Sequence, residues 1–178
     1  TDRVVHAASA PVFIVRGSAA ARADPATFKR VMVPLDGSSL AVQALPLAAD
    51  IAERAPAELL LMQAVSASID AYPAVAPLGR PDLMPAEFLR ELRARAGQEL
   101  EEQATALRAR GLTVATRVVN GYPAEAIVDE AERQSVDLLV MATHGYSGLK
   151  RWALGSVSDK VLHAAVTPLL LVRARATS

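Results

Sequence analysis

The chain has 178 residues and a mass of 18.8 kDa, a size that fits one domain. Hydrophobic residues make up 52% and charged residues 21%, which excludes an intrinsically disordered chain. The 19 basic residues balance the 19 acidic residues, so the chain lacks the positive field that non-specific binding to nucleic acid or to an anionic membrane needs. It has no cysteine, and no apolar run approaches the roughly 20 residues of a membrane span. We therefore expect a cytoplasmic globular protein without nucleic-acid or membrane partners.

An internal repeat links the two ends of the chain. Residues 1–16 (TDRVVHAASAPVFIVR) align without a gap with residues 158–173 (SDKVLHAAVTPLLLVR), and eight of the sixteen positions are identical. We interpret 1–16 as the terminal helix and strand of a copy that precedes the domain at 29–173, and 17–28 as a linker. Because the first residue is Thr, we expect the chain to start inside a longer reading frame. The alternative is two unrelated helix–proline–strand segments.

Strand and helix patterns alternate through the rest of the chain. The expected strands cover residues 29–34, 58–65, 113–119, 136–142 and 168–172, with 113–119 at an edge because Arg117 interrupts its apolar pattern. The expected helices cover residues 38–53, 89–111, 123–134 and 156–165, and a proline-rich loop covers 66–84. This alternation predicts an α/β fold with a parallel sheet covered by helices on both faces. Ligands bind such sheets beyond the carboxyl ends of the strands, which here are 34–39, 64–66 and 142–158.

A glycine-rich turn follows the strand at 136–142. Gly145 and Gly148 allow close backbone approach to a ligand, and Gly155 stands directly before a helix whose first amides come from 156–158. Free amides and the positive end of a helix dipole form an anion site, so the turn is a candidate phosphate cradle. An equally weighted interpretation is purely structural: the serines of the turn cap the helix, with Asp159 in a capping box.

The chain resembles the universal stress protein family. The motif of that family is Gly, two residues, Gly, nine residues and Gly-Ser or Gly-Thr, which here runs from Ala142 through Gly145 to Gly155-Ser156. VMVPLDGS at 31–38 and TPLLLVR at 167–173 are similar to its first and last strands. The resemblance implies a flavodoxin-like, open parallel sheet of five strands in the order 3-2-1-4-5.

In one branch of the family, the resemblance further implies ATP, with Mg²⁺, beyond the strand ends. Carried over by position, Pro34, Leu35 and Asp36 face the adenosine, Ala64 walls the adenine, Ala142 lies under the ribose, and Gly145, Gly155, Ser156, Val157 and Ser158 hold the phosphates. Asp36 is also a candidate N-cap of the first helix. Ala142 departs from the motif, since a methyl group there limits positive φ and crowds the sugar.

Three function classes follow from these patterns. We favour an ATP-binding stress-response sensor or regulator with little or no hydrolysis, because His144, Lys150 and Arg151 are the few candidate catalytic groups near the glycines. The alternative is a nucleotide-free interaction module whose site Ala142 inactivates. An enzyme on the same sheet, such as a nucleotidyl transferase or flavoprotein, is disfavoured because the chain has no GxxxxGK[ST] loop or early GxGxxG.

The apolar strand at 168–172 (PLLLV) lies at an edge in the expected strand order, and unpaired apolar edges promote aggregation. In the resembled family this strand pairs with its own copy across a dimer axis. Residues 11–15 (PVFIV) are a second copy of it, so we expect 11–15 to pair antiparallel with 168–172. The pairing can occur within one chain, as a pseudo-dimer, or be swapped between two chains in a homodimer, which we slightly favour.

Overall fold

The computed structural model describes residues 8, 10–16, 28–66, 86–143 and 154–174. Within these residues the strands are β1 (Val12–Ile14), β2 (Arg30–Leu35), β3 (Glu58–Val65), β4 (Val114–Asn120), β5 (Leu138–Ala142) and β6 (Leu169–Val172). The helices are η3 (Ala41–Ala44, a 3₁₀ turn), α2 (Leu45–Arg54), α3 (Ala86–Ala109), α4 (Pro123–Arg133) and α5 (Ser156–Ala164).

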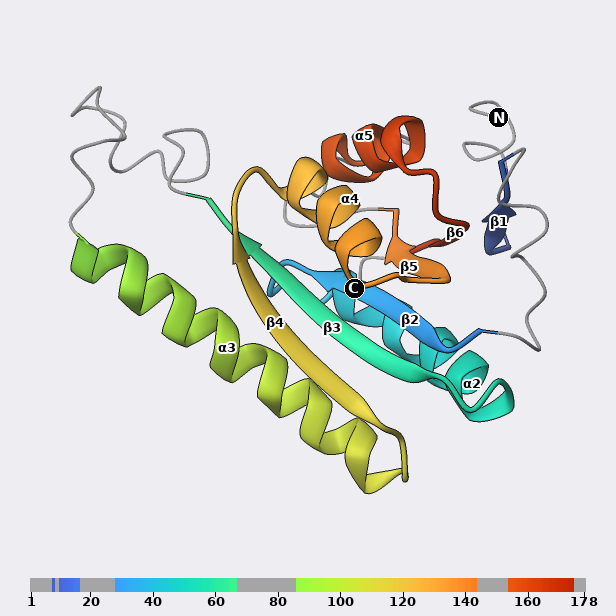
Figure 1. Cartoon of the computed structure of the whole chain (residues 1–178), viewed down its shortest axis with the longest axis horizontal. Helices are drawn as coiled ribbons and strands as arrows, with labels where there is room; N and C mark the ends of the chain where they lie inside the picture. The colour runs from blue at the N-terminus through green and yellow to red at the C-terminus, as the bar shows by residue number, and fades with distance from the viewer. Residues whose placement is uncertain (1–7, 9, 17–27, 67–85, 144–153, 175–178) are drawn as a thin grey trace.

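All six strands belong to one sheet in the order β1-β6-β5-β2-β3-β4 (Figure 1). The five strands β2 to β6 are parallel to their neighbours, and their order is the expected 3-2-1-4-5. β4 lies at one edge, as predicted for 113–119. The sheet differs from the five-stranded expectation by one strand, because β1 adds antiparallel to β6. The predicted antiparallel pairing of 11–15 with 168–172 is therefore confirmed over Val12–Ile14 and Leu169–Leu171, here between two segments of the same chain.

Alternating side chains along the strands build a separate core on each face of the sheet. In β3, for example, Leu59 and Leu61 face one core whereas Leu60 and Met62 face the other, as the two-residue period of a strand dictates. Helices α2 and α3 cover the first face, and α4 and α5 cover the second, so every central strand is buried on both sides (Figure 1). The long apolar runs of the sequence reflect this double burial.

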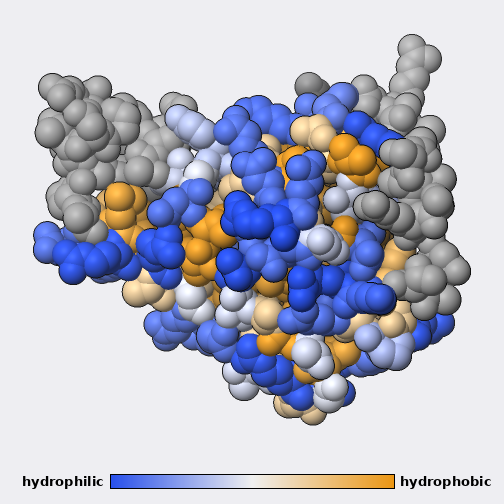
Figure 2. Space-filling view, viewed as in Figure 1, coloured by the Kyte–Doolittle hydropathy of each residue, from blue (hydrophilic) through white to orange (hydrophobic). Residues whose placement is uncertain are grey.

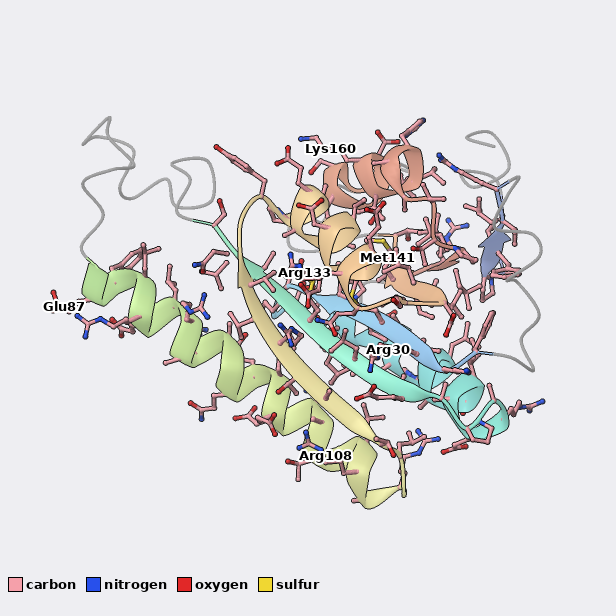
Figure 3. The ribbon with its side chains drawn as sticks, viewed as in Figure 1. Arg30, Glu87, Arg108, Arg133, Met141 and Lys160 are labelled. Atoms are coloured by element: carbon pink, nitrogen blue, oxygen red, sulfur yellow. The ribbon has the colours of Figure 1, made fainter. Side chains whose placement is uncertain are left out.

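Polar contacts close the sheet at the amino ends of its strands. Arg30 forms an ion pair with Glu58 at 2.7 Å and also donates to the carbonyl of Gln134 at 2.7 Å. Asp137 accepts the backbone N–H groups of Lys29 and Arg30 at 2.8 and 3.0 Å. Figure 3 shows Arg30 near the start of β2 and Arg133 at the end of α4. These contacts satisfy the backbone N–H groups of Lys29 and Arg30 and stabilise this end of the sheet.

The first helical segment begins later than the expected residue 38. Residues Ala41–Ala44 form a 3₁₀ turn, and the α-helix starts only at Leu45 with Pro46 in its first turn. Proline suits that place because the first amides of a helix have no intrahelical acceptor. Residues 67–85 and 17–27, which hold most of the expected loop and linker, lie outside the described residues.

The surface on the face shown in Figure 2 is mainly hydrophilic, with small apolar areas between polar side chains. Large exposed apolar side chains in the described part are Phe13, Tyr122 and Val166. No helix within the described residues is long and apolar enough to span a membrane.

Candidate nucleotide site

The sheet opens where its strand order reverses, between β2 and β5. The two strands pair at Val31–Leu138 and Met32–Leu139, and the pairing ends there. Pro34 follows in β2 and has no N–H to donate, which is consistent with the strands separating towards their carboxyl ends. A crevice at such a reversal is the usual ligand position in an open α/β sheet.

A cavity of about 580 Å³ lies at these strand ends, a size typical of small-molecule sites. Nine of the ten residues predicted for the site line it together: Pro34, Leu35, Asp36, Ala64, Ala142, Gly155, Ser156, Val157 and Ser158. The tenth, Gly145, lies outside the described residues, as do Gly148, His144, Lys150 and Arg151. Sequence segments more than 100 residues apart therefore meet at one cavity.

The amino end of α5 forms one wall of this cavity. Gly155 is the N-cap residue, and its N–H donates to the carbonyl of Thr143 at 2.8 Å. The Ser158 hydroxyl donates to the carbonyl of Ala142 at 3.0 Å, which ties the first turn of α5 to the end of β5. The structural alternative, with serine side chains as helix caps, is wrong because Gly155 is the N-cap residue and no side-chain cap bond forms among the described residues. The first-turn amides thus keep their capacity to bind an anion.

Backbone geometry corrects the expectation of strain at Ala142 and shows no strain at Gly155. Ala142 is the last residue of β5 and pairs with Val172, and it is not among the described residues with positive φ. The methyl group in place of the motif glycine therefore costs no backbone strain. Gly155 has φ −62° and ψ 149°, an extended conformation open to any residue, so a side chain at this position would not strain the turn.

Asp36 organises the turn after β2 through Ser38. Its Oδ1 accepts the N–H of Ser38 at 3.0 Å and the Ser38 hydroxyl at 2.6 Å. That hydroxyl in turn accepts the N–H of Ala41 at 3.1 Å. The N-cap expectation for Asp36 is therefore wrong: Leu40 occupies the N-cap position of η3, and Ser38 satisfies the helical amide. Asp36 itself is exposed beside the cavity.

Helix α3 supplies a wall that the sequence patterns did not predict. Arg95 and Glu99 line the cavity and form an ion pair at 2.9 Å. Glu99 lies over Gly37, where a Cβ atom would come within 2.7 Å of its Oε2, and Gly37 has φ +77°. Only glycine fits this position easily, because a side chain would meet both strain and Glu99.

Gln63, on β3, is the second feature that sequence reasoning missed. It lines the cavity, and its Oε1 is buried without a hydrogen-bond donor among the described residues. A buried acceptor without a partner is costly, which makes it a candidate for a ligand N–H. The signal was present in the sequence, since Gln63 is the one polar residue within the run LLLMQAV at 59–65.

Comparison with known proteins gives the family. The model of the universal stress protein family matches residues 27–173. The chain belongs to the universal stress protein family. Universal stress protein MJ0531 of Methanocaldococcus jannaschii is 34% identical over 147 residues, which are 82% of each chain. A universal stress protein of Mycolicibacterium smegmatis is 30% identical over 172 residues, which are 97% of this chain but only 54% of its own length.

A solved universal stress protein in complex with cAMP has the same fold. It is 27% identical, with a TM-score of 0.55, and the match covers 83% of this chain and 98% of that protein. This structural neighbour therefore binds an adenine nucleotide. Within the described residues of the present universal stress protein, no cluster of three or more His, Asp or Glu side chains could hold a metal ion.

Proposed function

We propose that this universal stress protein binds ATP in the cavity between β2 and β5 and acts as a sensor or regulator in a stress response, with little or no hydrolysis. The observation that carries the proposal is the convergence of nine predicted residues on a cavity of about 580 Å³ that the amino end of α5 borders. The cAMP complex of a structural neighbour supports an adenine nucleotide as the ligand class.

The cavity offers suitable groups for each part of the nucleotide. Ala64 and Met62 supply apolar surface for the base, and Gln63 Oε1 supplies an acceptor that fits the 6-amino group of adenine. Asp36 supplies a carboxylate for the ribose hydroxyls. At the other side, the amides of Gly155–Ser158 lie at a helix amino end, where phosphate is favoured.

A Mg²⁺ ion that is bound to the phosphates fits this arrangement. Mg²⁺ keeps several waters and is usually held by substrate phosphates with one or two carboxylates. Among the described lining residues, Asp36 and Glu99 are the carboxylates, and Glu99 is engaged by Arg95. When bound, the ion would neutralise phosphate charge.

The charged side chains that line the cavity also support slow hydrolysis. Phosphoryl transfer needs cationic groups on the transferring phosphate and a residue that positions the attacking water. Arg95 is the sole cation among the described lining residues, and it forms an ion pair with Glu99. The wall of the phosphate region, Gly155–Ser158, carries no basic or acidic side chain. We therefore infer binding and release of intact ATP as the functional event.

Calorimetry on two variants of Ser156 tests the phosphate assignment. Ser156 is exposed at the first position of α5, where Asp is favourable for the helix, so Ser156→Asp should fold normally. Its carboxylate should repel the phosphates and weaken ATP binding at least tenfold, about 1.4 kcal/mol. Ser156→Asn, equal in size but neutral, should bind ATP nearly as the wild type does, and both should bind adenosine equally.

Three results would contradict the proposal. Equal ATP affinity in Ser156→Asp and Ser156→Asn would remove the phosphates from the amino end of α5. A parallel loss of adenosine binding would mean that the substitution disturbs the whole cavity. Absence of ATP binding by the wild type would favour the nucleotide-free interaction module.

We also propose that 1–16 derives from a preceding copy of the domain, with 17–28 as its linker to 29–173. The match to MJ0531 covers 82% of this chain, whereas the match to the Mycolicibacterium smegmatis protein covers 97% of it and about half of that longer protein. The larger share includes most of the amino-terminal segment. This pattern is expected if that segment belongs to a two-domain arrangement.

A further inference from the structure

The edge strand β4 presents part of its backbone outside the sheet. Among the described residues β4 pairs with β3 alone, so no strand of the described part lies on its other side. The carbonyl of Thr113 accepts the N–H of Leu59 at 2.9 Å, so residue 113 faces β3. The N–H and C=O groups of one residue point to the same side of a strand, and successive residues alternate. The backbone groups of Val114, Thr116 and Val118 therefore point outwards.

Two arginines of α3 reach the outward carbonyls. Helix α3 packs alongside β4 (Figure 1). Arg108 donates to the carbonyl of Val114 through Nε at 3.1 Å and through Nη2 at 2.8 Å. Arg93 donates to the carbonyl of Val118 at 3.5 Å. The outward carbonyls on both sides of Thr116 are thus covered by guanidinium groups of the same chain.

Further polar contacts hold these arginines along the edge. Arg108 donates to Glu101 Oε2 at 2.7 Å, and Glu101 Oε1 accepts the hydroxyl of Thr116. Arg93 donates to the side-chain oxygen of Asn120, the last residue of β4. Each guanidinium therefore has a second partner besides its strand carbonyl, which fixes its position over the edge.

The strand itself lacks the usual protection of a sheet edge. Edge strands are commonly very short, or they carry proline or outward charge. β4 has seven residues without proline, and its one charged residue is Arg117. Arg117 forms an ion pair at 2.7 Å with the buried Glu130 of α4. The groups that cover the outward carbonyls of β4 therefore come from α3.

We propose that Arg93 and Arg108 close the β4 edge to strand addition by β4 of a second copy of this chain. Two identical edges present the same groups to each other, so an uncovered β4 would pair antiparallel with its copy about a two-fold axis. An incoming strand needs the outward carbonyls as acceptors, and the arginines occupy them. Helix α3 is thus an intramolecular inhibitor of association at this edge. The proposal does not depend on nucleotide binding.

Sedimentation of paired arginine variants in the full chain tests this role. Arg93→Ala with Arg108→Ala should associate more strongly than the wild type, with the dimer dissociation constant lowered roughly tenfold or more. Arg90→Ala with Arg110→Ala is the matched control, because it removes the same charge. The described ion pairs of Arg90 and Arg110 are with acidic residues of α3 and α2. This control should sediment as the wild type does.

Thr116→Pro, added to the Arg93→Ala, Arg108→Ala variant, locates the association. The N–H of Thr116 points outwards, so proline there removes no bond to β3 but obstructs an incoming strand. The triple variant should return to the sedimentation of the wild type. Hydrogen exchange should show added protection of 114–120 in the associated double variant. Circular dichroism checks folding, and Arg93→Ala alone, which leaves the Glu101–Arg108 bond in place, should associate in the same direction if the double variant unfolds.

The proposal fails on any of three outcomes. Folded arginine variants that sediment like the wild type would show that Arg93 and Arg108 do not close the edge. Equal association by the Arg90→Ala, Arg110→Ala control would assign the effect to lost positive charge. A folded triple variant that still associates would place the contact on another surface.

Discussion

Gln63 is a polar residue at a position where its strand neighbours are apolar. Its side chain lies on the face of β3 that carries α3, next to the turn at Gly37, with Nε2 3.8 Å from the place of a Gly37 Cβ atom. The buried Oε1 without a donor has no structural use in the described part of the chain. A leucine at this position would avoid the free-energy cost of a buried acceptor without a donor. A ligand role therefore explains the glutamine better than stability does.

The Gln63 acceptor predicts a specific preference for the base. Gln63→Leu should weaken ATP binding by about 0.5–1.5 kcal/mol, a factor of roughly 2–10, because the 6-amino group loses its acceptor. Inosine triphosphate carries an oxygen in place of that amino group, so its affinity should not fall. Inosine triphosphate, which keeps the ribose and the phosphates, is therefore the internal control. Isothermal calorimetry with both nucleotides measures the ratio, and an equal loss for both would assign Gln63 a structural role.

At the scale of elements, α3 is positioned by contacts at its carboxyl end. Glu101 accepts from Arg108 at 2.7 Å and from the Thr116 hydroxyl on β4. Arg108 also donates to the carbonyl of Val114 at 2.8 Å, and Figure 3 shows it near the end of α3. These bonds join α3 to the edge strand β4. Because α3 also carries Arg95 and Glu99, they hold one wall of the cavity in place.

The hydrogen bonds from Arg108 and Thr116 lower the pKa of Glu101. A carboxyl whose pKa is lowered by folding stabilises the protein above its unfolded pKa, and that contribution is lost as the pH falls through the folded pKa. Glu101→Gln should therefore unfold at lower urea concentration than the wild type at pH 7, and the difference should shrink as the pH falls below the ordinary pKa of glutamate through the lowered pKa of Glu101. Half the side chain is exposed, so the effect should be modest.

Glu91→Gln is the matched control for this measurement, because Glu91 is an exposed glutamate on the same helix. It should unfold like the wild type at pH 7 and at low pH. A Glu101→Gln difference that persists unchanged at low pH would show that the ionised carboxylate is not the stabilising group.

At the scale of the whole molecule, the amino and carboxyl ends of the strands differ in how their polar groups are paired. The amino ends of β2, β3 and β5 are closed by Arg30, Glu58 and Asp137. The carboxyl ends diverge around the cavity, where the Gln63 acceptor has no donor among the described residues and α5 presents its amides. Stabilising polar contacts therefore lie at one end of these strands, and the candidate binding site lies at the other.

This separation predicts that stability and binding can be changed independently. Asp137→Ala leaves two backbone N–H groups without their acceptor, so it should lower the free energy of unfolding by about 1–3 kcal/mol. The ATP dissociation constant should stay within about twofold, since Asp137 lies at the opposite end of the strands. Asp129→Ala, an exposed change on α4, should alter neither quantity. Denaturation and calorimetry on the folded variants measure both, and a large loss of ATP affinity in Asp137→Ala would contradict the separation.

The sequence patterns alone determined the strands, the covering helices and the edge of the sheet where the cavity lies, whereas the strand order came from the resemblance to the universal stress protein family. Period-two and period-3.6 patterns are local, and the apolar runs directly reflect strands buried on both faces. The repeat between 1–16 and 158–173 predicted the β1–β6 pairing only in combination with the edge-strand pairing of the resembled family. The motif from Ala142 to Ser156 likewise placed the α5 wall at the cavity.

Only the tertiary structure decided the details that depend on residues distant in the chain. Ser158 looked like a helix cap, but its hydroxyl donates to Ala142, an acceptor on another element. Asp36 acts through Ser38, and Ala142 stays unstrained because it completes a ladder with Val172. The α3 wall could not be predicted from the sequence. Helical periodicity shows which face of a helix is buried, but it does not show that Arg95 and Glu99 border this cavity. Whether a polar group is satisfied depends on neighbours that folding brings together, and local patterns carry no information about them.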